Sequence, residues 1–213
     1  MEKIRLTSLA DGIFAIVMTL LVLEIRVPIA GGAAAAGELS TVLWGMGPVL
    51  MSYLLSFVVL FTFWRAHHFI VSGYAKNVDS TLININAIFF FFVALVPFTS
   101  VLLGRYSDTQ LAVVLFSLHV IVLGLLLYWM RNHILFADTI ENEAITLAAL
   151  WHSNIRVAVP VVFAVLSILL SFLSITLSLV LLTLAVVFNL FAKSTALVDW
   201  ILGHVFKVRI EQE

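Results

Sequence analysis

The sequence predicts an all-α membrane protein that crosses the bilayer several times. Hydrophobic residues make up 63% of its 213 positions and charged residues 11%, whereas soluble domains have about 45–50% and about 25%. Several long stretches carry no charge, and a helix needs about 20 apolar residues to span a membrane. We therefore expect little mass outside the membrane.

Six membrane-spanning helices are expected, and they would form a single domain over residues 1–213. The uncharged stretches place them at about residues 6–27, 39–64, 80–104, 109–130, 157–172 and 175–192. Residues 157–192 carry no charge and would form about 54 Å of helix, too long for one crossing of about 30 Å. We expect a break in the serine-rich junction at residues 171–174. Without that break the count would be five.

The basic residues predict that both termini lie in the cytoplasm. With six spans, Arg26 and Arg105 fall outside, and cytoplasmic loops normally carry the excess of Lys and Arg. The pattern therefore predicts a multi-pass protein of the cell (inner) membrane. The first apolar run is too long for a cleaved signal peptide, and it contains Asp11. The basic residues predicted to lie inside are Lys3, Arg5, Arg65, Lys76, Arg131, Arg156, Lys193, Lys207 and Arg209.

Several functional classes find no support in the residues. The net charge is -1 and there is no cysteine, so neither a nucleic-acid partner nor a thiolate site is expected. Within the spans only Asp11 and Glu24 are acidic, at opposite ends of one helix, so clustered catalytic groups are missing and no enzyme is expected. His67 and His68 would point about 100° apart on a helix, which disfavours a shared metal ion. No cofactor is predicted.

The first expected helix carries the most informative residues. Asp11 lies inside an apolar run, where an unpartnered charge costs at least a few kcal/mol and usually has a function. Ile16, Thr19, Leu20 and Leu23 have the spacing i, i+3, i+4 and i+7, so they share one helix face. This stripe is compatible with ordinary helix packing. It is also compatible with a pore lining, in which rings of apolar side chains form a constriction.

The residues of this helix resemble the transmembrane protein 175 family of potassium channels. Arg5, followed after three residues by Leu9-Ala10-Asp11, is similar to the family signature Arg-x-x-x-Phe-Ser-Asp, from which Leu9 and Ala10 depart. The lost serine hydroxyl removes any hydrogen bond that depends on it. Further similarity is found in residues 12–16, 19–20, 23–24 and 63–69, and in Asn84, Asn86, Pro97 and Phe98.

The resemblance implies a homotetrameric, weakly potassium-selective channel built from one six-helix unit per subunit. In such a channel the first helices line the pore, and Ile16, Leu20 and Leu23 would form its hydrophobic constriction. Thr19 would lie beside them as a hydroxyl layer. The implied partners are potassium ions in transit, the lipid bilayer and further copies of the chain. The alternative is a secondary transporter of a small cation or solute, although we find no internal repeat of the kind that transporters show.

Asp11 needs a partner outside its own helix. Arg5 lies six residues earlier, about 240° around the helix, so the two side chains do not form an i,i+4 pair. We expect hydrogen bonds to Asp11 from a group on the second and third spans, which would tie the first helix to its neighbours. The alternative is that Asp11 reaches cytoplasmic water. The expected group consists of His67, His68, Asn84 and Asn86.

Glu24 lies at the opposite end of the first helix. Its carboxylate would concentrate cations at a pore mouth, or it would pair with the neighbouring Arg26. The sequence favours neither role over the other.

Overall fold

The computed structural model describes residues 2–27, 36–141 and 147–190, and the regular secondary structure in these ranges is helical. The expected all-α fold is therefore confirmed. The tail with Lys193, Lys207 and Arg209 lies outside the described residues, as do the last two residues of the sixth expected span. The helices are α1 (Lys3–Leu23), α2 (Ala36–Gly45), α3 (Gly47–Tyr74), α4 (Ser80–Ala94), α5 (Val96–Arg105), α6 (Gln110–Phe136), α7 (Leu147–Ser171) and α8 (Ile175–Leu190).

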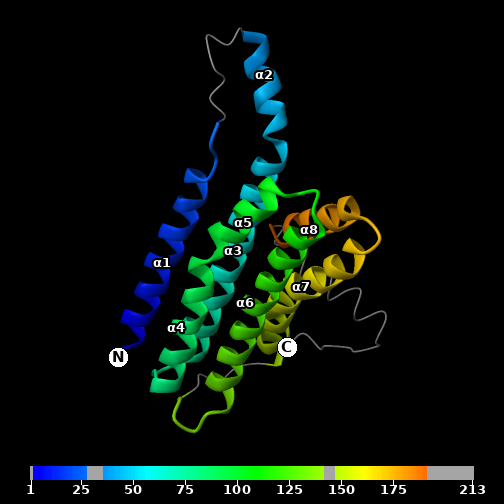
Figure 1. The fold of residues 1–213 in the computed structure, drawn as a ribbon. Helices are drawn as coiled ribbons and strands as arrows, with labels where there is room; N and C mark the ends of the chain where they lie inside the picture. Colours follow the sequence, from blue (N-terminus) through cyan, green and yellow to red (C-terminus); the bar gives the residue numbers. More distant parts are fainter. Residues whose placement is uncertain (1, 28–35, 142–146, 191–213) are drawn as a thin grey trace.

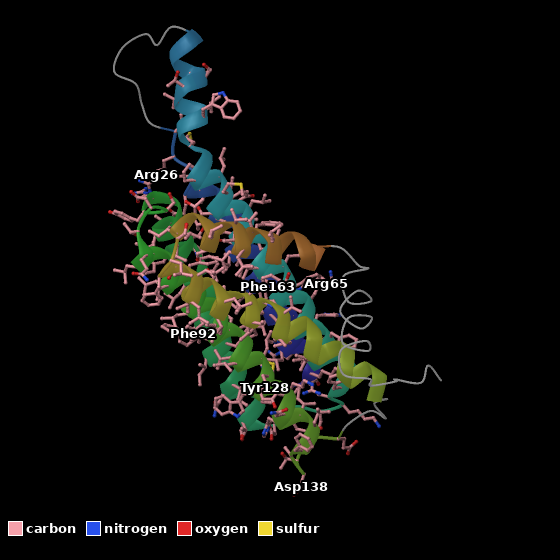
Figure 2. The ribbon with its side chains drawn as sticks, turned by 90° about the vertical axis from the view of Figure 1, so that its right-hand side faces the viewer. Arg26, Arg65, Phe92, Tyr128, Asp138 and Phe163 are labelled. Atoms are coloured by element: carbon pink, nitrogen blue, oxygen red, sulfur yellow. The ribbon has the colours of Figure 1, made fainter. Side chains whose placement is uncertain are left out.

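The long helices run side by side in one bundle (Figure 1). α1 lies on one side and α7 with α8 on the other, with α3, α4, α5 and α6 between them. α2 continues the direction of α3 beyond the end of the bundle. Figure 2 shows Arg26 and Asp138 toward opposite ends of this bundle.

Four helical segments are long and apolar enough to cross a membrane: α1, α3, α4 continued by α5, and α6. In the described part of the chain, α7 and α8 contribute only the shorter apolar helices Val157–Ser171 and Ile175–Leu184. α7 ends at Ser171 and α8 begins at Ile175, on either side of the serine-rich junction. The count of six crossings thus stays a prediction, because the apolar parts of the last two helices that the structure describes are shorter than a span of about 20 residues.

Two of the expected spans are each divided into two helices. Met46 separates α2 from α3 and Leu95 separates α4 from α5, and each following helix has a proline in its first turn. Proline is tolerated there because its missing N–H would be unpaired anyway. At the second break, the Phe92 carbonyl accepts a hydrogen bond from His119 Nε2 at 2.8 Å. The same carbonyl accepts from the Leu95 N–H at 3.1 Å, so His119 is a second donor to it and ties α6 to the helix break.

α3 continues past the expected end of the second span at residue 64 and reaches Tyr74. The polar residues after Trp64 predicted an end there, but the helix is maintained because His67 is buried with a partner on α4. α6 likewise runs to Phe136 instead of residue 130. Hydropathy locates the apolar core of a helix, whereas polar helical turns beyond that core depend on tertiary partners.

Small residues bring α6 and α7 close together. A Cβ atom added at Gly124 would lie 2.2 Å from Val161 Cγ2, so only glycine fits without movement of a neighbour. Further along, Ser167 lies between Ser117 and Ser178, with Oγ–Oγ distances of 3.4 and 2.6 Å. Small side chains and hydroxyl pairs are the usual means of joining helices in a membrane, where burial of apolar surface gives no net drive.

Asp79 connects three segments at the end of the bundle where α4 begins. Its carboxylate caps α4 by accepting from the Leu82 N–H at 2.7 Å. It also contacts His133 Nε2 at 2.9 Å and accepts from the Thr139 hydroxyl at 2.6 Å. The burial of Asp79 opposes its charge, but these hydrogen bonds and the nearby His133 outweigh that effect and hold its pKa below the usual 3.8.

We expect the stability that this carboxylate contributes to be lost in acid. Since folding lowers the pKa of Asp79, the contribution is complete above the unfolded value near 3.8 and disappears as the pH falls through the folded value. Asp79→Asn keeps a side chain that caps helices well but removes the charge. Thermal unfolding in detergent should show the variant less stable at pH 7 and similar to the wild type below pH about 3. A difference that does not change with pH would contradict this assignment.

Candidate functional site

α1 has one buried face and one uncovered face. The buried side chains recur every three or four residues and pack against the rest of the bundle: they are Leu6, Ala10, Phe14, Val17 and Leu21. The predicted stripe lies on the other face, where the exposed fractions of Ile16, Leu20 and Leu23 are 60%, 43% and 66%. Thr19 is also exposed, and its hydroxyl donates to the Ile16 carbonyl at 2.8 Å. No described part of the same chain covers this face.

Asp11 is paired across helices with a residue that we did not expect. Its Oδ1 accepts a hydrogen bond from Trp64 Nε1 on α3, at 2.8 Å. Trp64 lies one helical turn before the expected partners His67 and His68, and its ring is 6.0 Å from that of His68. The tie between α1 and α3 is therefore present, but an indole makes it. Tryptophan usually finds a hydrogen-bond partner when it is packed against other groups. The presence of Trp64 near the polar end of this span was therefore the sequence feature that could have indicated it as a donor to Asp11.

The buried polar pair of the site is His67 and Asn86. Their exposed fractions are 1% and 0%, and His67 Nε2 lies 2.7 Å from Asn86 Oδ1. The Asn86 amide group donates to the Leu82 carbonyl at 2.8 Å. With the amide oriented in this way, Oδ1 is the acceptor and His67 Nε2 carries the donated hydrogen. The pair connects α3 to α4, and Asp11 is not part of its hydrogen bonds.

Aromatic rings pack around this pair, and one of them, Phe14, belongs to α1. The His67 ring stacks on Phe89 with a centroid distance of 5.6 Å and an interplanar angle of 3°. Phe14 is fully buried, with its ring 6.4 Å from His67 and 6.0 Å from Phe89. Phe14 thus anchors the buried face of α1 to α3 and α4, while the opposite face stays open.

The remaining predicted residues lie near the surface of the described chain. Arg5, His68 and Asn84 are exposed, and Glu24 is half-buried as the C-cap of α1. Lys3, which the sequence did not single out, donates from Nζ to the Ser72 carbonyl at 2.8 Å. This contact ties the start of α1 to the end of α3. Among the residues that the structure describes, no group of three or more His, Cys, Asp or Glu is placed to hold a metal ion.

Comparisons with known proteins agree on one family. Residues 5–97 match the family model described as endosomal/lysosomal potassium channel TMEM175. A relative named potassium channel B446_29190, from Streptomyces collinus, is 34% identical over 58% of this chain and 60% of its own length. Potassium channel Cha6605_3372 from Chamaesiphon minutus is 36% identical over 49% of this chain and 51% of its own length. The match therefore spans little more than half the length of these two relatives.

Two further comparisons cover more of the molecule. Potassium channel HX13_20290 from a Chryseobacterium strain is 27% identical over 80% of this chain and 83% of its own length. The crystal structure of a lysosomal potassium-selective channel TMEM175 homolog from Chamaesiphon minutus superposes with a TM-score of 0.71. That alignment covers 88% of this chain and 95% of the other, at 24% sequence identity, and so shows a common fold. The resemblance carried by the first-helix residues is confirmed: the chain is similar to the TMEM175 family over residues 5–97 and to named potassium channels over a larger part of its length.

Proposed function

We propose that this chain forms a potassium-selective channel in which four copies surround a pore lined by α1. The uncovered face of α1 is the observation that carries the proposal. Ile16, Leu20 and Leu23 project from a helix whose opposite face is held firmly by Phe14 and by the Asp11–Trp64 hydrogen bond. We infer the ion from the relatives, each of which is named a potassium channel.

Cyclic assembly would turn the exposed stripe of α1 into rings of side chains. Closed symmetry is the usual form of oligomers built from one chain, and an axis beside α1 would bring the same residues of each copy together. Ile16, Leu20 and Leu23 would form apolar rings, which control passage by pore diameter and by exclusion of water. Thr19 already donates its hydrogen to its own helix, so the lone pairs of its oxygen would face the ion.

The same assembly would place acidic residues of α1 near both ends of the pore. With both termini in the cytoplasm, the Glu24 carboxylates would surround the outer mouth and raise the local concentration of cations. Asp11 would lie near the inner end, where its bond to Trp64 fixes the position of the helix and is not part of the ion path. Conduction in this scheme follows the electrochemical gradient without a coupled ion or nucleotide.

We expect Ile16→Asn to raise ion flux and reduce discrimination between potassium and sodium. An amide in the constriction would keep it wetted and lower the cost of moving a hydrated ion through it. The measurement is flux from liposomes that contain the purified protein, first with a potassium gradient and then with a sodium gradient. Ile88→Asn is the matched control, because Ile88 is an exposed isoleucine on α4, which does not line the proposed pore.

Unchanged flux in both Ile16→Asn and Leu20→Asn would show that α1 does not line the pore. Absence of flux in the wild type, with reconstitution verified, would favour a secondary transporter, and uptake driven by a second ion gradient would then be the test. Equal effects of Ile16→Asn and Ile88→Asn would mean that the substitution perturbs the membrane seal in general.

A further inference from the structure

A cavity of about 400 Å³ lies between α8, α3 and the end of α5, and no residue of α1 lines it. Its walls on α3 include Met51 and Leu55, and those on α8 include Val180 and Leu184. The lining positions recur every three or four residues on both helices, so each helix contributes one face. Those faces extend for roughly 10 Å along each helix, which makes the cavity an elongated slot.

The walls of this slot are more apolar than their composition indicates. Ser52 and Thr183 both line it, but each hydroxyl donates to a carbonyl of its own helix, Val49 at 2.9 Å and Leu179 at 2.8 Å. Their polar hydrogens are therefore already used within the helices. The other hydroxyls, of Ser107 and Thr176, lie at the rim, where α5 has ended and α8 begins. The slot is thus apolar inside and polar at one end.

We propose that the slot binds one acyl chain of a membrane phospholipid, with the polar part of the lipid at Ser107 and Thr176. Protein interiors seldom keep voids larger than a water molecule, and apolar cavities do not hold water. The volume lies in the range of ordinary ligand sites. Both lining faces belong to helices of the apolar bundle, which would be surrounded by the bilayer. The acyl chains of lipids are therefore the apolar molecules that could enter the slot.

The position of the slot favours lipid over a second copy of the chain. α8 lies on the opposite side of the bundle from α1, and both views agree on this placement (Figures 1 and 2). In the proposed tetramer, α1 faces the axis, so α8 would face the surrounding bilayer. This choice of occupant rests on the proposed function, whereas the existence of a binding slot does not.

The test is photolabelling in liposomes made with a phosphatidylcholine that carries a diazirine on one acyl chain. Labelled positions are identified by mass spectrometry of the digested protein. Leu55 and Leu103 line the slot but are only 5% and 3% exposed, so bulk lipid does not reach them. We expect label on both residues in the wild type.

Val180→Trp should abolish the label on Leu55 and Leu103, because the indole fills the slot. Leu177→Trp is the matched control: Leu177 is 55% exposed on the same helix and does not line the slot, so wild-type labelling should persist. Met51→Trp and Leu54→Trp repeat the comparison on α3, which guards against one variant that does not fold.

Two outcomes would overturn the proposal. Equal labelling of Leu55 and Leu103 in Val180→Trp and Leu177→Trp would show that lipid reaches these residues by another route. Label on Leu177 but on no slot residue of the wild type would show that protein, from a second copy or from the same chain, closes the slot. Neither result depends on ion flux, so failure here is distinguishable from failure of the proposed channel.

Discussion

Replacing Phe14 by alanine should loosen α1 from the bundle and lower the free energy of unfolding by about 3–5 kcal/mol, the usual cost of removing a buried phenylalanine. Phe14 is fully buried, and its ring lies against His67 and Phe89 on the two neighbouring helices. Since contacts between membrane helices depend on close packing, loss of the ring removes a contact that joins α1 to both α3 and α4.

The measurement is unfolding of the purified protein in mixed micelles with increasing denaturing detergent, followed by helical circular dichroism. Phe98→Ala is the control, because Phe98 is 61% exposed and surface substitutions usually change stability by less than about 0.5 kcal/mol. If the proposed channel is correct, Phe14→Ala should also reduce the yield of assembled oligomer. Similar stabilities of the two variants would show that the other contacts of α1 hold it in place without the Phe14 ring.

Asn86→Leu should destabilise the protein by about 1–3 kcal/mol, the cost of leaving a buried polar group without a partner. His67 Nε2 would then face an apolar wall at 1% exposure. The contact itself contributes less, roughly 0.6 kcal/mol on average between membrane helices. Most of the expected loss of stability therefore comes from leaving the His67 imidazole without a hydrogen-bond partner.

Adding His67→Phe to Asn86→Leu should restore part of the lost stability, because both polar partners are then removed together. The two single variants and the double variant form a double-mutant cycle that isolates the pairwise term. Asn84→Leu serves as control, since Asn84 is exposed on the same helix. A double variant that is less stable than the sum of the single changes predicts would refute the assignment of His67 and Asn86 as one pair.

Much of the site was predictable because it depends on periodicity along one helix. Ile16, Thr19, Leu20 and Leu23 share a face by spacing alone, and the structure leaves that face uncovered. Whether it packed inside the chain or remained open could not be predicted. That outcome depends on the rotation of α1 about its axis, which is decided by Phe14 and its neighbours.

The partner of Asp11 shows the limit of prediction from sequence more clearly. The sequence predicted partners on the second and third spans, but the hydrogen bond comes from Trp64 on α3, which was not among them. His67, one turn further along, is instead directed to Asn86. Trp64 and His67 are three residues apart and lie on one side of α3. Which of them reaches Asp11 depends on the rotation and depth of α1 relative to α3, and neither helix alone determines that.

The sequence by itself determined that this chain is helical and built for a lipid bilayer, and the first-helix residues determined its family resemblance. Both properties are local, because the cost of burying charge and the spacing of side chains follow from residue type and order. Only the tertiary structure decided that α1 turns its Ile16 face outward, that Leu95 interrupts the third expected span, and that α8 leaves a slot beside α3. These features arise where surfaces of different helices meet, and their fit depends on packing across the bundle.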